Sequence, residues 1–436
     1  MELELKARGQ PIATHRVRRT SVRAIVARAV LLALIVIGVP SDGHLGTARL
    51  ARIAHQAVSG KRFDLVSWEI QAIGQKVRDG VQKPGSDLSP DAQRELVVAY
   101  MDGINRLNAL TREIEAAAAG VERTGAARGV AELQAELDDL RVLQADRRPA
   151  VEWIIERQVS TVLEELGFST AGMVVPPVSF QFTESPNYLI VSPRDRIRVE
   201  RGIHLDPTLS IEEMEEIEAE VSVRSDRSTI IEGTGGFSSY PTMVLEYGVL
   251  RWGIDTVAHE WAHLYLFPRP LGWNYDASGD MRTINETVAS MFGEEVSRLV
   301  MERYYPDLLS PAPWPRPLSK QEDWLSPARV ETSFEFGAFM RETRLEVDRL
   351  LAAGQIEAAE AYMEARRGLL VERGYSIRKL NQAYFAFHGS YAVGTSATDP
   401  IGGKLRALRL RTDTLATFMQ IVARFDAPAD LDAVLG

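Results

Sequence analysis

Two histidines and a glutamate that could act together lie in the segment His259-Glu260-Trp261-Ala262-His263. Residues four apart lie on the same face of a helix, so both imidazoles can reach one metal ion. Imidazole nitrogen suits zinc, and a glutamate directly after the first histidine lies beside the metal, where it can take a proton from water. The segment therefore predicts a zinc site with His259 and His263 as ligands and Glu260 as general base.

A catalytic zinc needs a further ligand, because such sites usually have three protein ligands and one open position. The metzincin extension is absent, since Leu266 and Arg269 stand where it has glycine and histidine. Three carboxylates further along the chain are alternatives, Glu286, Glu294 and Glu295. A third ligand must place an oxygen within roughly 3–4 Å of both imidazole nitrogens if all are to share one zinc.

The first of these carboxylates lies in the motif Asn285-Glu286-Thr287-Val288-Ala289. A HExxH helix followed by an Asn-Glu-x-x-Ala helix resembles the gluzincin class of metallopeptidases, and the resemblance covers residues 253–296. It implies that His259, His263 and Glu286 bind one Zn²⁺ per chain. It also implies hydrolysis of peptide bonds by a zinc-activated water, with Glu260 as general base.

One position departs from this resemblance. Several gluzincins have an acidic residue one turn after the glutamate ligand, where it supports a zinc histidine, and this chain has Ser290 there. The support must then come from elsewhere. Asp255, one turn before His259, is a candidate for this role.

Hydrolysis usually needs a further donor for the oxyanion, and an aromatic segment near the C-terminus is the best place to look for it. Aromatic or imidazole side chains crowd the sequence from Tyr384 to Tyr391. One interpretation is a buried aromatic helix end. The other is a catalytic role for Tyr384, His388 or Tyr391 facing the zinc, with Tyr240 and Tyr247 as weaker candidates.

The elements that must position these residues follow from the hydrophobic periodicity. Helices are predicted at 250–267 and about 281–304, joined by a tight aromatic turn at 269–275. Short strands are predicted at 178–182, 188–191, 197–199 and 229–231, and 237–245 could supply an edge strand that aligns an extended peptide. Further helices are expected across 43–167, including a long hairpin at 113–146, and at 211–223, about 333–353, 356–372, 376–387 and 405–425.

These elements predict an α+β, mostly helical protein with a zincin-like core at 168–305. A helical domain at 43–167 precedes the core, and a helical C-terminal domain at 306–436 follows it. The net charge of −10 argues against a nucleic-acid partner, whose binding face should be basic. The chain has no cysteine, which excludes disulfides, thiolate zinc ligands and a cysteine nucleophile.

Residues 1–42 predict where the protein is located. Residues 1–28 carry seven basic side chains against two acidic ones, and an uncharged apolar run follows at 29–40. This order is typical of an export signal, although the run is shorter than the roughly 20 residues that cross a bilayer. We favour a single-pass signal anchor with an extracytoplasmic catalytic domain over a cleaved signal and secretion. A buried helix with a basic tail is a further alternative.

The partners expected are therefore a peptide or protein substrate and a membrane contacted through the N-terminal segment. The oligomeric state does not follow from the sequence. The main alternative function is a catalytically inactive zincin-fold scaffold anchored to a membrane. Retention of Glu260 argues against it, because a non-catalytic protein has no chemical need for this carboxylate. A helical membrane protein with an accidental HExxH segment is the remaining alternative.

Overall fold

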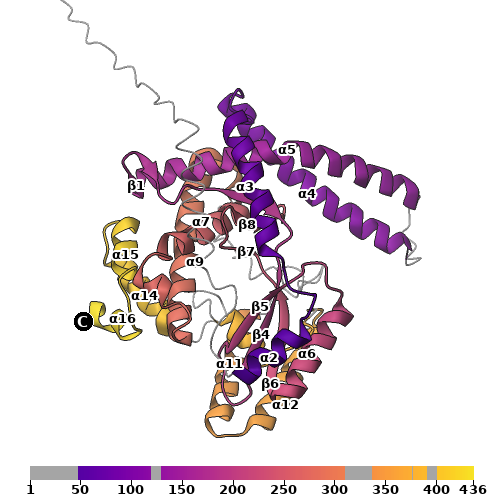
Figure 1. Ribbon diagram of the computed structural model, residues 1–436, viewed down its shortest axis with the longest axis vertical. Helices are drawn as coiled ribbons and strands as arrows, with labels where there is room; N and C mark the ends of the chain where they lie inside the picture. Colours follow the sequence, from indigo (N-terminus) through magenta and orange to yellow (C-terminus); the bar gives the residue numbers. More distant parts are fainter. Residues whose placement is uncertain (1–47, 119–128, 310–335, 376, 390–399) are drawn as a thin grey trace, which may run out of the picture. The chain divides into compact units, whose positions relative to one another are not determined.

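The two helices that carry the predicted ligands form close to their predicted positions. In this computed structural model, which describes residues 48–118, 129–309, 336–375, 377–389 and 400–436, α7 spans Leu250–Leu266 and α9 spans Gly279–Tyr304 (Figure 1). α7 ends just before Pro268, which lacks the amide hydrogen that a helix interior needs. α9 begins after Ser278, whose hydroxyl accepts a hydrogen bond from the Met281 amide at 3.1 Å.

The region before the strands is helical, as predicted. Its helices are α2 (Ala48–Ala57), α3 (Leu65–Gln82), α4 (Pro90–Ala118) and α5 (Val130–Glu165). α4 and α5 lie side by side as the two arms expected of a hairpin (Figure 1). The residues that connect these arms, 119–128, lie outside the described residues.

One antiparallel sheet has the strand order β5-β4-β6, built from β4 (Asn187–Pro193), β5 (Arg201–Leu205) and β6 (Arg227–Gly233). The strands predicted at 188–191 and 229–231 are therefore confirmed, and helix α6 (Ile211–Ser225) follows the prediction closely. The strand predicted at 197–199 is wrong, because the pairing starts later, at β5. Val199 is instead buried in a core cluster and the half-buried Ile197 packs against it, which explains the alternation that suggested a strand.

The second sheet lies next to α7 and has the order β3-β8-β7. β3 (Phe180–Thr183) runs parallel to β8 (Thr242–Leu245), and the two-residue strand β7 (Gly236–Phe237) pairs antiparallel with β8. The edge strand predicted at 237–245 is therefore misplaced, because β8 in this segment is the central strand and the edge strand β7 precedes it. A separate small hairpin consists of β1 (Ser169–Thr170) and β2 (Met173–Val174).

The outer edge of β3 is covered by charged side chains from two helices. The amides of Phe180 and Phe182 donate to the carboxylates of Glu156 and Glu152 on α5, at 2.9 and 2.7 Å. Lys76 on α3 lies within 2.9 Å of both carboxylates. These contacts satisfy strand amides that would otherwise be open to another chain.

The C-terminal helices agree with the predicted ranges only in part, and the helix predicted at 356–372 is confirmed. After η1 (Pro306–Leu308) they are α11 (Phe336–Ala352), α12 (Ile356–Glu372), α13 (Gln382–His388), α14 (Pro400–Leu410), α15 (Leu415–Val422) and α16 (Ala429–Leu435). The helix predicted at 376–387 begins only at Gln382, because Asn381 caps it by accepting from the Tyr384 amide at 2.9 Å. The helix predicted at 405–425 is two helices, since Thr414 caps the start of α15.

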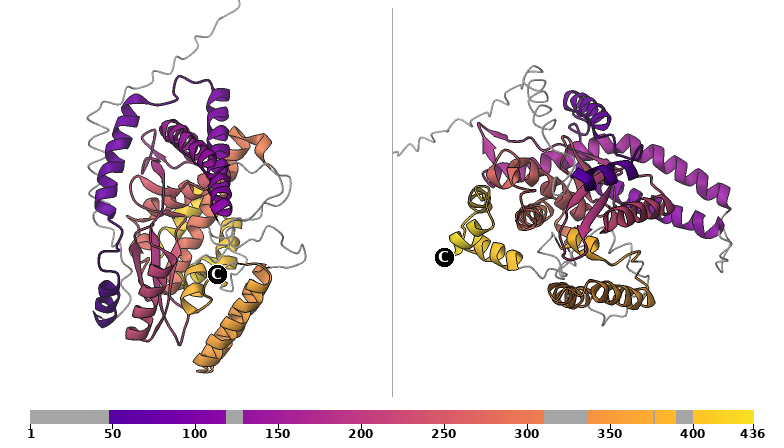
Figure 2. Two further views of the ribbon diagram at one scale, coloured as in Figure 1. Left: turned by 90° about the vertical axis from the view of Figure 1, so that its right-hand side faces the viewer. Right: turned by 60° about the horizontal axis from the view of Figure 1, so that its bottom comes forward.

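The fold is α+β and mostly helical, as the sequence predicts, and α11 and α12 lie side by side (Figure 2). The largest core cluster packs α7 and α9 against α5, β3 and the last helices. In it the rings of Trp261 and Phe292 stack at 5.4 Å, and truncation of such a buried aromatic typically costs about 3–5 kcal/mol. Among the described residues, no helix is both long and apolar enough to cross a membrane.

Candidate metal centre

A close approach of α7 and α9 brings the predicted ligands together. At Gly293, two turns after Glu286, a Cβ atom would lie 2.7 Å from the Asp255 carbonyl oxygen and 3.3 Å from the His259 Cβ. Only glycine fits this contact without displacing α7. The glycine therefore sets the separation of the two helices, and with it the distance between the histidines on one and the glutamate on the other.

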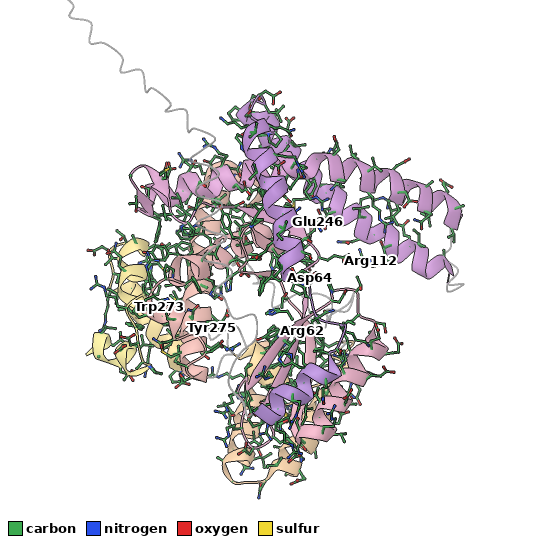
Figure 3. The ribbon with its side chains drawn as sticks, in the orientation of Figure 1. Arg62, Asp64, Arg112, Glu246, Trp273 and Tyr275 are labelled. Atoms are coloured by element: carbon green, nitrogen blue, oxygen red, sulfur yellow. The ribbon has the colours of Figure 1, made fainter. Side chains whose placement is uncertain are left out.

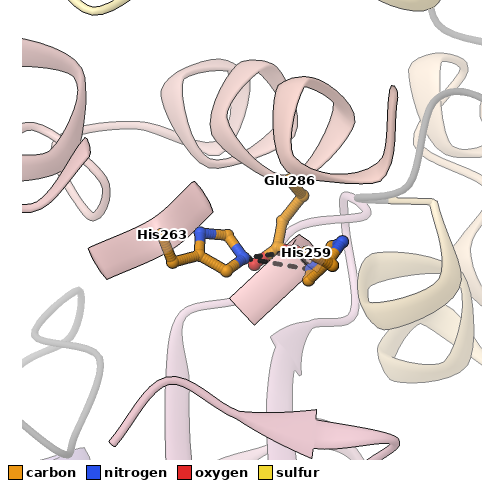
Figure 4. A group of neighbouring side chains, drawn as sticks. All are labelled: His259, His263 and Glu286. Carbon is orange, nitrogen blue, oxygen red and sulfur yellow. Dashed lines mark hydrogen bonds and ion pairs between the residues drawn. The ribbon is translucent and has the colours of Figure 1, made fainter. Parts of the chain in front are cut away.

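His259, His263 and Glu286 converge on one point (Figure 4). The Nε2 atoms of the two imidazoles are 3.1 Å apart, and each lies 3.4 Å from Oε2 of Glu286. Ligand atoms at about 2.0–2.1 Å from a tetrahedral zinc lie roughly 3.3 Å from one another. The three donor atoms thus have the mutual spacing that a shared zinc requires.

The surroundings of Glu286 also fit a metal. Its side chain is 9% exposed, and Oε2 accepts no hydrogen bond from the residues that the structure describes. A buried carboxylate oxygen without a hydrogen bond is costly unless another group satisfies it. Two imidazoles and a carboxylate are one of the donor sets found in catalytic zinc sites, so the residues present fit this ion.

The close contact between His263 and Glu286 also determines their pKa values. Burial lowers the pKa of His263, but the Glu286 carboxylate opposes burial and raises that pKa to about 9. Burial raises the pKa of Glu286, whereas His263 and His259 hold it well below its usual range. Glu286 is therefore anionic, and its charge is balanced by a cation, either a proton on His263 or a metal in its place.

Asn285 orients His263. Its Nδ2 donates to the Leu271 carbonyl at 3.1 Å, which fixes the amide so that Oδ1 faces the Nδ1 atom of His263 at 2.8 Å. Oδ1 can only accept, so His263 carries its proton on Nδ1 when the ring is neutral. Its Nε2 lone pair is then directed toward His259 and Glu286, as a metal ligand requires.

Ser290 occupies the corresponding place beside His259. Its hydroxyl lies 3.5 Å from the His259 Nδ1, at the limit of a hydrogen bond. Ser290 thus stands beside His259 at the position where several gluzincins have an acidic residue. The role expected for Asp255 stays a prediction, although this residue does lie where α7 and α9 touch.

Glu260 lies beside the group and is 7% exposed. The Ser238 hydroxyl donates to its Oε2. At Gly236 a Cβ atom would be 2.5 Å from Oε1 of Glu260 and 2.8 Å from Cγ2 of Thr256, so a side chain here would displace the Glu260 carboxylate. The edge strand β7 therefore lies directly against the predicted general base. Only the proximity of β7 reveals the role of Ser238, and no sequence pattern signals it.

Tyr275 is a further residue that the sequence does not single out, beyond its place in the predicted aromatic turn after α7. Figure 3 labels it together with Trp273, from the same connector. Trp273 is 71% exposed, whereas the Tyr275 hydroxyl donates to Oε1 of Glu286. The guanidinium of Arg282 lies 4.8 Å from the Tyr275 ring and forms an ion pair with Asp276.

The other candidates from the sequence lie elsewhere. Glu294 is exposed, and Glu295 forms a two-point ion pair with Arg409 at 2.7 and 3.0 Å. Of the three alternative carboxylates, the structure brings Glu286 to the histidines. The Tyr247 ring packs on Trp252 at 5.3 Å.

Tyr384 and His388 belong to the aromatic end of α13, which packs on β4 and β6. Tyr384 is 1% exposed, and its ring lies 4.1 Å from that of His388. The Nε2 atom of His388 is buried and has no hydrogen-bond partner among the described residues, and burial lowers the pKa of this histidine to about 3. Tyr391 lies outside the described residues. These contacts favour the packing interpretation of the segment.

Comparison with protein-family models, curated proteins and solved structures gives no match for this chain. The functional argument therefore rests on the side chains and their geometry.

Proposed function

We propose that this chain is a gluzincin-like zinc metallopeptidase in which His259, His263 and Glu286 hold one Zn²⁺. The observation that carries the proposal is the triangle of donor atoms, with sides of 3.1, 3.4 and 3.4 Å, next to the buried carboxylate of Glu260. An accidental HExxH segment would have no reason to have a third ligand at zinc spacing or an amide that orients one histidine.

When bound, zinc supplies a Lewis acid that lowers the pKa of water to about 7 and polarises a carbonyl group. Glu260 takes the proton of the attacking water and passes it to the leaving amine. Ser238 holds the Glu260 carboxylate by a hydrogen bond, so that the proton acceptor keeps a fixed orientation. The substrate is a peptide or protein.

The proposed catalytic core is zincin-like and covers residues 168–305, between helical regions at 43–167 and 306–436. Sheet β3-β8-β7 next to α7 supports this, because its edge strand β7 lies against Glu260. The N-terminal segment, which lies outside the described residues, anchors the protein to a membrane with the catalytic part extracytoplasmic, or directs its secretion.

Glu260→Gln is the substitution that tests the catalytic role. The full chain is purified in detergent, loaded with zinc and given an unfolded protein as substrate. We expect the variant to retain one zinc per chain and to lose cleavage by about 10²–10⁴-fold, the usual contribution of a general base. Bound zinc without cleavage in the unsubstituted protein would support a scaffold instead, and equal cleavage by both proteins would remove Glu260 from the mechanism.

A further inference from the structure

The two oxygens of Glu286 have different surroundings. Oε2 faces the Nε2 atoms of His259 and His263, whereas Oε1 accepts the hydrogen bond from the Tyr275 hydroxyl. The Tyr275 ring also lies edge-on to the His263 ring, with centroids 6.2 Å apart. One residue of the connector between α7 and α9 thus contacts a ligand from each helix.

We propose that Tyr275 is a positioning residue that restricts Glu286 to binding the metal through one oxygen. This inference rests on the proposed metal site. A carboxylate can bind a metal through one oxygen or both, and the second mode would use a coordination position that a catalytic site must keep open. By holding Oε1, the phenol leaves the fourth position free for water or substrate.

Arg282 and Asp276 keep Tyr275 in place. Arg282 lies one turn before Glu286 on α9, so it is within reach of an ion pair with that carboxylate. Its guanidinium instead pairs with Asp276 and covers the Tyr275 ring. Tyr188 of β4 is a further hydrogen-bond partner of Arg282. The positive charge is thereby drawn away from Glu286, and the ring that donates to Oε1 is packed from one side.

Tyr275→Phe tests the inference because it removes the hydroxyl and keeps the ring. We expect zinc affinity, measured by competition with a chelator, to fall about tenfold, the lower end of the effect of residues that support metal ligands. Loaded with Co²⁺, the variant should show a weaker visible absorption band, because Co²⁺ absorbs less strongly when its coordination number rises above four. Neither readout requires peptidase activity.

Tyr265→Phe is the matched control. Tyr265 lies two residues after His263, and its ring stacks on Trp261 at 5.4 Å. It contacts none of the three ligands through a hydrogen bond in the described structure, so its loss of a hydroxyl should leave the zinc affinity and the Co²⁺ spectrum unchanged. Equal changes in both variants would overturn the inference.

A double-mutant cycle with Glu286→Ala separates positioning from packing. If Tyr275 acts through the carboxylate, Tyr275→Phe should no longer alter zinc affinity once Glu286 is absent. A loss of the same size in both backgrounds would overturn the inference.

Should Tyr275→Phe fail to fold, Asp276→Asn replaces it. This substitution frees Arg282 to pair with Glu286 and should weaken zinc binding in the same direction. Unchanged zinc affinity in a folded Asp276→Asn protein would then contradict the inference. Absence of zinc from the unsubstituted protein would instead refute the metal site itself.

Discussion

His263 on α7 and His388 on α13 show two different environments for a histidine in this protein. Both ring nitrogens of His263 face polar partners, Asn285 on one side and Glu286 on the other, and its pKa is raised to about 9. His388 packs against the rings of Tyr384 and Phe387, and its pKa is lowered to about 3. Burial acts on both rings, so the neighbouring carboxylate and amide distinguish the proposed ligand His263 from the packing residue His388.

The largest effect that this comparison predicts is on metal binding. His263→Ala should reduce zinc affinity by more than about 100-fold, because loss of a ligand exceeds the 10–100-fold loss expected for a residue that only supports one. His388→Ala should leave zinc affinity within about twofold of the original protein. Zinc content after dialysis against a chelator measures both. Similar losses in the two variants would show that the aromatic end of α13 belongs to the metal site.

A smaller effect is expected at Asn285, the residue that gives His263 its orientation. Asn285→Ala removes the acceptor for the His263 Nδ1 hydrogen and should weaken zinc binding by roughly 10–100-fold. Asn285→Asp retains an acceptor for His263 but loses the donor to the Leu271 carbonyl, so its zinc affinity should fall less than that of Asn285→Ala. Chelator competition again supplies the measurement. If the two variants bind zinc equally poorly, Asn285 supports the helix packing rather than the histidine.

The smallest effect concerns His388 and appears in stability rather than in metal binding. Between pH 6.5 and about pH 3 the unfolded chain binds a proton on this ring and the folded protein does not, so stability falls as the pH decreases through this window. At pH 5.5 the loss relative to pH 7 is about 1.2 kcal/mol.

His388→Phe keeps an aromatic ring and removes the titration. Its free energy of unfolding should therefore decline less between pH 7 and pH 5.5, as measured by urea denaturation. An identical decline in both proteins would indicate that His388 is accessible to protons in the folded state. That outcome would revive the catalytic role that the sequence suggested for it.

The convergence of His259, His263 and Glu286, the proposed metal ligands, could be predicted from the sequence because the spacing of their motifs is a property of single helices. His259 and His263 share a face of α7, and the Asn285-Glu286 motif places a carboxylate early in α9. The supporting contacts could not be predicted in this way, because they join separate elements. Ser238 reaches Glu260 only through the position of β7, and Tyr275 reaches Glu286 only through the path of the connector.

The same distinction explains the errors in the fold. The hydrophobic pattern located α7, α9, β4 and β6, which are all rich in buried apolar residues. It failed at 197–199, where apolar residues alternate without pairing, and at the ends of the C-terminal helices, where Asn381 and Thr414 determine the first turn. A capping side chain accepts a hydrogen bond from a backbone amide and so fixes where the helix begins. The pattern of hydrophobic residues does not show the position of such a cap.

The carboxylates that cover β3 make the two edges of its sheet unequal as places for a further strand to pair. Glu152 and Glu156 accept from the outer amides of β3, and Lys76 pairs with both carboxylates. In the described part of the chain, these amides are therefore not free to pair with a further strand on that side. Pairing of a further strand is then favoured at the opposite edge of the sheet, where β7 lies against Glu260. A peptide recruited by backbone pairing would thus be guided toward the proposed catalytic residues rather than captured on the far side, out of their reach.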